Sequence, residues 1–321
     1  MAFTSLAKTT SLDNSLKFAE ILQRTLDQQL LAHTTTSWME ANAGQVIYNG
    51  GKTVKIASIN MSGLKDYDRV NGYPQGSVEM AYQTLTMTQD RGNKFRLDAI
   101  DVDETGFLAN AAVVAGEFQR TKVAPEIDAY RYSKLFNKIK TANSITGSSY
   151  ALSTVNIIEE LSKAINGIYD KVGFQPLVIT MSYNTLNVLE NSEKIEKKMS
   201  VETFGGNINL KVKTFDGIPI IAVPSSLFKS DYTFYKGNEV ISGDSASPAN
   251  NGFAASPTAN NIDWIITPAT APIAVSKTDF IKIVSPDINQ FANAWDINYR
   301  KFHDIWLTDE KAKACTVRFK S

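Results

Sequence analysis

Hydrophobic residues at helical spacing predict a series of helices. The first is an amphipathic segment near the N-terminus, "SLDNSLKFAEILQRTLDQQLLAH". We expect its apolar face to pack against another surface. A second helix is predicted by hydrophobic residues at i, i+4, i+7 and i+11, namely Phe107, Ala111, Val114 and Phe118. Pro125 interrupts the pattern, which then continues to Lys140. Because proline favours a first helical turn and cannot donate a helical hydrogen bond, we expect a kinked helix or two helices end to end.

A long polar stretch between two strand-like segments predicts a projecting hairpin. The residues from Val46 to Ile59 have the pattern of a strand, a turn and a second strand. The next residues, "NMSGLKDYDRVNGYPQGS", are polar and rich in glycine, and Val78 to Met87 again favour a strand. The flanks of this stretch can pair, but its tip has little apolar surface to bury. We therefore expect a long hairpin that extends from the body of the protein.

Helices and strands alternate in the middle of the chain. Ser153 or Thr154 is the predicted cap of a third helix, which Gly173 closes. A short buried strand, "PLVITM", precedes a helix capped by Ser182. Two further strands, "INLKVKTF" and "IPIIAVP", are joined by a turn at Asp216-Gly217. This order predicts a compact α+β domain.

The last part of the chain is a loop followed by strands. Residues 242–261 are small and polar with proline and glycine, a composition that cannot build a core and predicts an exposed loop. Only strand-like segments follow, which are "IDWIITP", "DFIKIVSP", "AWDINYRKFHDIWL" and "KACTVRF". The chain is therefore expected to end in a sheet.

Composition narrows the class of protein. The 321 residues are 43% hydrophobic and 21% charged, as in ordinary globular proteins, and 33 basic residues balance 33 acidic ones. No global charge therefore draws the chain to nucleic acid or membrane. The N-terminus lacks the basic start and apolar run of a signal peptide, and no stretch approaches the about 20 apolar residues of a membrane span, so we expect a soluble protein made in a cytoplasm. The single cysteine, Cys315, excludes an intrachain disulfide and is expected to be a small buried residue.

The stretch "NGGKT", residues 49–53, resembles part of a phosphate-binding loop. That loop has the pattern G-x-x-x-x-G-K-[ST] and opens a helix. Here Gly51 precedes Lys52, but the position of the first glycine is taken by Val46, and the next residues alternate as in a strand. We therefore predict a turn between two strands and no nucleotide binding.

No other group of residues predicts catalysis, a cofactor or a metal. His33 and His303 have no partner at the spacing of a triad or metal site, and His303 is expected to be a hydrogen-bonded or exposed strand residue. The acidic residues Asp98, Asp101, Asp103 and Glu104 lack the glycine of a calcium loop and are interpreted as favourable charges before a helix N-terminus. We therefore predict that the protein is not an enzyme.

The order of these parts resembles the major capsid protein of tailed bacteriophages, in particular the siphophage type with the Hong Kong 97-type fold. The resemblance is carried by "FRLDAIDVDET" leading into "VAGEFQRTKVAPEIDAYRYSKL", by "TFDGIPIIAVP", and by "AWDINYRKFHDIWLTDEKAKACTVRF". Together with the hairpin, these strings cover most of the chain. They support a fold and contain no catalytic motif.

The resemblance implies a fold and a division of the chain. It implies an α+β fold with an N-terminal arm, an extended E-loop hairpin, a P-domain with a long spine helix, and an A-domain. The implied boundaries are 1–40 for the arm, 41–57 for P-domain strands, 58–97 for the E-loop, 98–144 for the P-domain with spine helix, 145–261 for the A-domain and 262–321 for the return of the P-domain sheet.

The resemblance also implies a function and partners. Many copies would form hexamers and pentamers and close into an icosahedral shell around double-stranded DNA, in a virion assembled in the host cytoplasm. A portal, a separate scaffolding protein and a decoration protein are the implied further partners, and DNA would contact the inner face without sequence specificity. An encapsulin-like shell protein is the alternative within this fold, and a phage tail or adhesin protein is the alternative of another class.

The tip of the hairpin is the predicted contact between subunits. It combines charges of both signs with aromatic residues, which are enriched at interfaces. Its predicted contact residues are Lys65, Asp66, Tyr67, Asp68, Arg69 and Tyr73. We expect the tip to rest on an adjacent subunit, with Asp66, Asp68 and Arg69 in intersubunit ion pairs.

Some relatives join their subunits by a bond between lysine and asparagine. The hairpin offers Lys65, and the late segment "SPDINQFANAW" offers Asn289 and Asn293. The reaction needs a carboxylate in an apolar pocket, but Asp287 and Asp296 are the only carboxylates nearby and no glutamate lies between 285 and 300. We therefore predict no crosslink.

Overall fold

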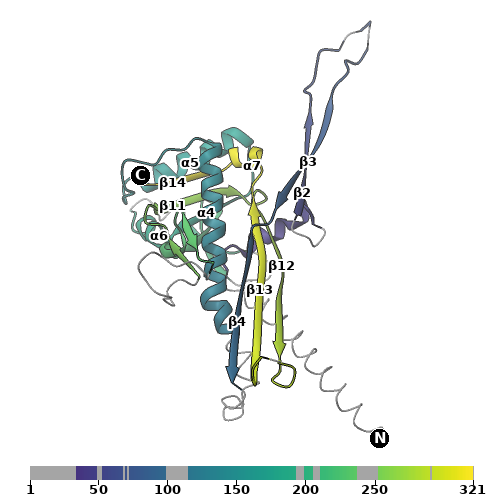
Figure 1. The fold of residues 1–321 in the computed structure, drawn as a ribbon. Helices are drawn as coiled ribbons and strands as arrows, with labels where there is room; N and C mark the ends of the chain where they lie inside the picture. Colours follow the sequence, from purple (N-terminus) through teal and green to yellow (C-terminus); the bar gives the residue numbers. More distant parts are fainter. Residues whose placement is uncertain are drawn as a thin grey trace.

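The computed structural model describes residues 34–48, 53–67, 69, 70, 72–98, 115–192, 199–204, 210–236, 252–289 and 291–320. Within them, a body of helices and two larger sheets carries one projecting hairpin (Figure 1). No helix in this part of the chain is both long and apolar enough to cross a bilayer.

A six-stranded sheet forms one half of the body. Its strands, in spatial order, are β14 (Thr316–Phe319), β11 (Ile262–Pro268), β5 (Leu177–Ser182), β8 (Ile218–Val223), β7 (Leu210–Phe215) and β6 (Met199–Phe204). Neighbours are antiparallel except β5 and β8, which are parallel. Helices α5 (Ile157–Val172) and α6 (Tyr183–Glu190) lie against it, and an apolar cluster that includes Leu161, Ile179 and Trp264 fills the space between them.

A long helix runs through the centre of the molecule (Figure 1). Residues 115–118 are helical, η2 (Gln119–Val123) is π-helical, and α4 (Ala124–Ala142) is a regular α-helix with Pro125 in its first turn. The predicted interruption at Pro125 is confirmed, and its form is a π segment, in which the Ala124 N–H reaches back to the carbonyl of Gln119. One side of α4 carries Tyr132, Phe136 and Ile139, which are fully buried.

A three-stranded antiparallel sheet lies on the other side of this helix. Its order is β12 (Ile273–Val284), β13 (Ala294–Trp306) and β4 (Gln89–Asp98). β13 is the central strand, so its residues contact both neighbours and the helix. Ile297 and Tyr299 on β13 pack with Val123 and Ile127 in an apolar cluster of their own.

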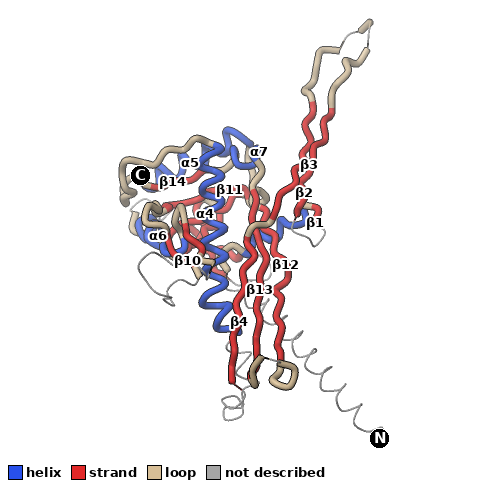
Figure 2. The backbone as a smooth tube through the Cα atoms, viewed as in Figure 1, coloured by secondary structure: helices blue, strands red, loops and turns tan. Residues whose placement is uncertain are grey.

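The hairpin consists of β2 (Thr53–Met61) and β3 (Val78–Thr86), paired in one register from Thr53 opposite Thr86 to Met61 opposite Val78. A short strand, β1 (Ile47–Tyr48), pairs with the base of β2, and the 3-10 helix η1 (Ser37–Gln45) precedes it. Figure 2 shows that the strands of the hairpin end before its tip, which is a loop. The strands that flank "NGGKT" thus pair as predicted, although residues 49–52 lie outside the described residues.

Several local predictions are confirmed. Ser182 caps α6, since its Oγ accepts a hydrogen bond from the Thr185 N–H at 3.1 Å. Gly173 ends α5 with φ of 74°, and the turn Asp216-Gly217 has φ of 55° and 78°. In each case the turn or cap depends on one or two residues that the sequence shows directly.

Other local predictions were wrong in detail. The N-cap of α5 is Asn156 and not Ser153 or Thr154, because a turn at 154–156 delays the helix. Part of the predicted loop 242–261 is strand β10 (Phe253–Ala255), which pairs with β9 (Tyr232–Phe234). The helix α7 (Asp309–Lys313) and the 3-10 helices η1 and η4 (Ser225–Leu227) were not predicted.

Long-range pairing divides the strands in a way that the sequence did not indicate. All of β4 except Asp98 lies within the predicted hairpin region 58–97, yet this strand pairs with β13. Within the predicted sheet return 262–321, β12 and β13 join the three-stranded sheet, whereas β11 and β14 join the six-stranded sheet. The strand assignments therefore hold, while the proposed boundaries between P-domain and A-domain stay a prediction.

Candidate assembly surface

An apolar stripe runs along one face of the hairpin. Val78, Met80 and Tyr82 alternate along β3 and so point to the same face, and Met61 lies opposite Val78 on β2. These four side chains are 58 to 67% exposed. A row of large exposed apolar residues on a projecting element is the usual mark of a contact with another molecule.

The tip beyond the strands is also exposed. Leu64 and Val70 are 106% and 90% exposed, and the predicted contact residues described here, Lys65, Asp66, Tyr67, Arg69 and Tyr73, are exposed as well. Asp68 lies outside the described residues.

The structure brings two of the predicted tip residues together. The rings of Tyr67 and Tyr73 meet edge to face, with centroids 5.1 Å apart. Lys65 donates from Nζ to the carbonyl of Gln75 at 3.0 Å and thereby joins the two sides of the loop. The aromatic pair forms a compact apolar element at the far end of the stripe.

The base of the hairpin is fixed to the body by an apolar cluster. Val54 and Ile56 of β2 pack with Met87, Val275 and Trp306, and all five are buried. The outer half of the hairpin has no such cluster among the described residues. One end of the hairpin is therefore held by the core and the other projects freely.

Asp304 adds polar contacts at the same junction. This fully buried carboxylate accepts hydrogen bonds from the Thr88 N–H at 2.9 Å and from the Tyr130 hydroxyl at 2.9 Å, and it pairs with Lys134 of α4. Burial and the adjacent Asp304 charge raise the pKa of Tyr130, which keeps its hydroxyl a donor. The carboxylate thus links the end of the hairpin to the long helix and to β13.

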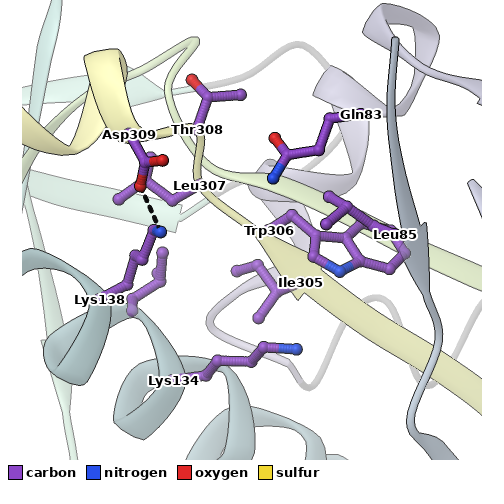
Figure 3. A pocket seen from close by; sticks show the side chains of 10 residues that line it. Gln83, Leu85, Lys134, Lys138, Ile305, Trp306, Leu307, Thr308 and Asp309 are labelled. Carbon is purple, nitrogen blue, oxygen red and sulfur yellow. Dashed lines mark hydrogen bonds and ion pairs between the residues drawn. The ribbon is translucent and has the colours of Figure 1, made fainter. Parts of the chain in front are cut away.

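A small cleft lies between the hairpin and the body (Figure 3). Its volume is about 320 Å³, and Gln83 and Leu85 of β3 form one wall. The opposite wall contains Lys134 and Lys138 of α4, and Lys138 is paired with Asp309. In Figure 3 Lys138 reaches Asp309, while Gln83 and Leu85 lie on the other side of the cleft.

Thr35 and Thr36 are anchored on the long helix. The carboxylate of Asp128 is buried and accepts hydrogen bonds from the backbone and hydroxyl groups of Thr35 and Thr36, at 2.6 to 3.2 Å. Burial raises the pKa of Asp128, and the bonds from the two threonines oppose that shift. The anchor thereby fixes the beginning of the described chain on α4.

A buried arginine completes this anchor. Arg131 is fully buried and donates to the hydroxyl of Thr36 at 3.1 Å and to Glu40 at 2.5 Å. Glu40 also accepts from the Ser276 hydroxyl at 2.6 Å. Burial would raise the pKa of Glu40, but Arg131 and Ser276 hold it below its usual value. The segment 34–45 is therefore tied to both α4 and β12.

Asp296 contacts Asn289, one of the two asparagines considered for a crosslink. It accepts from Arg96 at 2.9 Å, from Lys94 at 2.6 Å and from the Asn289 side-chain amide at 3.1 Å. Hydrogen bonds from Arg96 and Lys94 lower the pKa of Asp296 to about 2. A carboxylate held ionised by two cations is unlike the weakly acidic group that the bond-forming reaction needs. Lys65 lies at the distant hairpin tip, where it is bonded to Gln75.

His303 differs from its prediction. Its side chain is 2% exposed, and within the described residues its Nδ1 has no hydrogen-bond partner. The ring meets Tyr130 edge to face at 5.6 Å. The sequence suggested an exposed or hydrogen-bonded residue because alternation along β13 does not reveal that the helix covers this face.

The remaining candidates have simple roles or lie outside the described residues. Cys315 is buried as predicted, and burial raises the pKa of its thiol to about 12. Asp101, Asp103 and Glu104 lie outside the described residues, as does His33. In the part of the chain that is described, no group of three acidic, histidine or cysteine residues could hold a metal ion.

Sequence analysis missed several residues that matter here. Asp128, Arg131 and Asp304 act through partners far away in the chain, which local patterns do not show. The apolar stripe could have been found, because Val78, Met80 and Tyr82 alternate in a segment otherwise polar enough to be exposed.

Comparison with solved structures identifies the fold. The chain matches a protein of Mycobacterium phage Che8 with a TM-score of 0.51 and 14% identity, over 90% of this chain and 89% of that one. It matches the asymmetric unit of the bacteriophage PhiM1 mature capsid with a TM-score of 0.53 and 12% identity, over 86% and 84% of the two chains. It matches the capsid structure of the Cyanophage P-SCSP1u with a TM-score of 0.51 and 12% identity, over 84% of each chain. No family model and no curated protein sequence matches.

These matches define the class of fold. The chain has the α+β, Hong Kong 97-type fold of phage capsid structures, as the resemblance implied. The matches cover 84 to 90% of this chain.

Proposed function

We propose that this protein is a structural major capsid protein whose copies assemble into an icosahedral shell around the double-stranded DNA of a phage. The observation that carries the proposal is the projecting hairpin with its exposed apolar stripe, set on a capsid-type fold. Its role is that of a shell subunit and not of an enzyme, and its place is the capsid of the virion.

Energetics favour the stripe as the main contact of the hairpin. Burying one large apolar side chain contributes about 1.5–3 kcal/mol, and the stripe offers four of them. An exposed ion pair contributes about 0–1 kcal/mol. The charged tip residues Asp66, Asp68 and Arg69 are therefore expected to set register and orientation, while the stripe and the Tyr67–Tyr73 pair supply most of the affinity.

Geometry favours a contact that repeats. A hairpin of two strands is marginally stable alone, and here only its base packs on the body. A hairpin that docks on a different surface of the next subunit makes a heterologous contact, and such contacts propagate into rings and shells.

We assign residues 58–97 to this E-loop element, 1–40 to an arm, 145–261 to the A-domain, and 41–57, 98–144 and 262–321 to the P-domain.

The assembly contact can be tested by shortening the hairpin. Removal of Leu64 to Pro74 leaves Gly63, Gln75 and Gly76 as a three-residue loop between Ser62 and Ser77, which are already hydrogen-bonded at 3.0 Å. Loops of three residues with glycine are common in hairpins. We expect a folded subunit with near-normal thermal unfolding that forms no closed particles, as judged by electron microscopy and sedimentation.

Two outcomes decide this test. Closed particles formed by the shortened protein at the wild-type concentration would exclude the hairpin tip as an assembly element. Wild-type protein that forms fibres or rings, under conditions where it is folded and concentrated, would contradict the shell itself. DNA inside particles isolated from infected cells, with a portal at one vertex, would separate a phage capsid from other shells of this fold.

A further inference from the structure

The hairpin continues into the body through a corner of two residues. β3 ends at Thr86 and β4 begins at Gln89, so Met87 and Thr88 carry the chain from the sheet of the hairpin to the three-stranded sheet. A hinge of a projecting element consists of a few residues at the end of an element, which absorb the change in backbone angles. This corner therefore has the position of a hinge.

The base of the hairpin leaves room for movement toward the long helix. Val54 and Met87 hold the base in the buried apolar cluster described above. The cleft of about 320 Å³ separates β3 from α4, and its lining includes the apolar side chains of Leu85, Leu135 and Leu307 (Figure 3). Because burial of apolar surface is favourable, closing this cleft would be favourable as well. The hairpin thus has both space and a driving force to rotate toward α4.

A buried carboxylate holds the corner against this rotation. Thr88 donates to Oδ2 of Asp304 from its N–H at 2.9 Å and from its hydroxyl at 3.0 Å. The same hydroxyl lies 2.9 Å from the hydroxyl of Tyr130, which donates to Oδ1 of Asp304. Asp304 is fully buried, accepts from the Ile305 N–H at 2.7 Å and pairs with Lys134 in the lining of the cleft. The exposed Thr88 is therefore tied to a group that the core keeps in place.

The place of this corner contact, between Thr88 and Asp304, explains its effect on the strands. The last pair of the ladder between β13 and β4 is His303 opposite Gln89. Asp304 and Thr88 are the next residues along the two strands, so the carboxylate continues the pairing beyond the end of the ladder. The direction of β4 is thereby extended as far as the first residue of the corner.

We propose that the corner contact positions the hairpin, and that its release lets the hairpin rotate into the cleft toward α4. Thr88 and Asp304 are positioning residues, which act on the assembly surface through the direction of β3. The consequence for assembly rests on the proposed function: a hairpin in another direction presents its stripe to the next subunit at another angle, so the corner contact sets the curvature of the shell. The rotation itself is a property of one subunit.

The rotation can be measured in single subunits as the distance between two spin labels. Glu79→Cys on β3 and Thr141→Cys on α4 provide exposed attachment sites. The native Cys315 is buried and burial raises the pKa of its thiol to about 12, so it should stay unlabelled. Double electron–electron resonance at a concentration below that of assembly gives the distance distribution. We expect one narrow distance while the corner contact is intact.

Substitutions at the corner should change this distribution. Thr88→Val removes the hydroxyl at nearly constant size, and it should raise the ratio of short to long distances about five- to tenfold, the effect of one lost hydrogen bond at an exposed residue. Thr88→Ser keeps a hydroxyl and should give the original distribution. Asp304→Asn keeps the shape of the carboxylate without its charge and should have a larger effect. Thr86→Val, at an exposed threonine that ends β3, is the matched control and should change nothing.

Unchanged distances in the Thr88→Val and Asp304→Asn proteins, or an equal change in the Thr86→Val protein, would overturn the proposal. A lower midpoint of thermal unfolding with unchanged distances would show that Thr88 only stabilises the fold. If Asp304→Asn does not fold, the valine and serine variants of Thr88 still decide.

Electron microscopy of assembled protein tests the consequence for the shell. Thr88→Val should give a wider range of particle diameters than Thr88→Ser. Wild-type protein that forms no shells would contradict the proposed function, whereas the distances in single subunits would still decide the role of the corner contact. Equal diameters for the two variants, with changed distances, would contradict the effect on curvature.

Discussion

Charged side chains inside this protein are held by several partners each. Asp304 accepts from Thr88 and Tyr130 and pairs with Lys134, and Asp128 accepts from two threonines. A buried charge with one partner removed is left uncompensated, which costs more than an exposed pair contributes. These residues therefore fix the positions of the elements that they join.

The ion pairs of Asp296 predict a pH-dependent stability. Its pKa in the folded protein is about 2, below the usual 3.8, so its contribution is present above pH 3.8 and is lost as the pH falls to about 2. We expect Asp296→Asn to lower the midpoint of thermal unfolding at pH 6 and to lower it much less at pH 2.5. Circular dichroism at the two pH values measures the difference.

An exposed aspartate provides the control for this experiment. Asp170→Asn on α5 should change the unfolding midpoint little at either pH. A loss in Asp296→Asn that is as large at pH 2.5 as at pH 6 would show that packing, and not charge, is what Asp296 contributes.

At the scale of elements, turns and helix ends follow from single residues. In the long helix, the π segment Gln119–Val123 is likewise associated with a single residue, Pro125. A proline inside an α-helix lacks a donor and clashes with the carbonyl four residues earlier. Here the wider turn directly precedes Pro125, so the chain continues as a helix without the regular bond at that position.

Replacing glycine by alanine should change the free energy of unfolding in opposite directions at two positions. Gly217 has φ of 78° in the turn between β7 and β8, whereas Gly167 lies in α5 with open space around it. Gly217→Ala places an alanine in the left-handed backbone conformation, where its Cβ crowds the following carbonyl, and should reduce the free energy of unfolding by about 1–2 kcal/mol. Gly167→Ala should increase it by about 0.4–1 kcal/mol, because alanine favours the helix.

Urea unfolding of the two variants measures both effects against the wild type. The turn would not require positive φ if the Gly217→Ala variant were as stable as the wild type. A destabilised Gly167→Ala variant would indicate that the open space beside α5 is filled in solution.

The sequence predicted local features better than long-range ones. Ser182, Gly173 and Asp216-Gly217 act within a few residues of their own position, so their signals are local. The pairing of β4 with β13 and of β11 with β5 depends on segments about 200 and 85 residues apart, and alternation within one strand does not name its partner. For the same reason the burial of His303 and the partners of Asp304 were not predicted, and the contact role of the tip residues stays a prediction.

At the scale of the whole molecule, the apolar clusters formed by the described residues lie in the body and at the base of the hairpin. The hairpin beyond that base contributes little to the stability of a single subunit. Its sequence is therefore constrained by what it contacts in other copies, if the proposed shell is correct.

Substitutions in the stripe test whether the outer hairpin serves assembly and not the stability of one subunit. Met80→Ser combined with Tyr82→Ser removes two exposed apolar side chains from one face of the hairpin. We expect near-normal thermal unfolding and a critical concentration for shell assembly raised at least about tenfold, because each lost contact is worth about 1.5–3 kcal/mol. Light scattering against protein concentration measures the threshold.

The opposite face of the same strand is the control. Glu79→Ser combined with Gln83→Ser changes two exposed residues that alternate with the stripe. This variant should assemble at the wild-type concentration. Equal effects of the two double variants would mean that the hairpin acts through its backbone and not through one face.

Arg91 joins two residues, Tyr235 and Gly252, that are not neighbours in the sequence. Its guanidinium donates to the carbonyl of Tyr235 at 2.6 Å and to that of Gly252 at 3.0 Å, and the Tyr235 N–H bonds to Gly252 as well. Tyr235 and Gly252 are therefore held next to each other by contacts among described residues. Closing a longer loop costs little more than closing a short one. This position is thus one where evolution can lengthen the protein, or an engineer can insert a foreign peptide, with the underlying sheet and helix left in place.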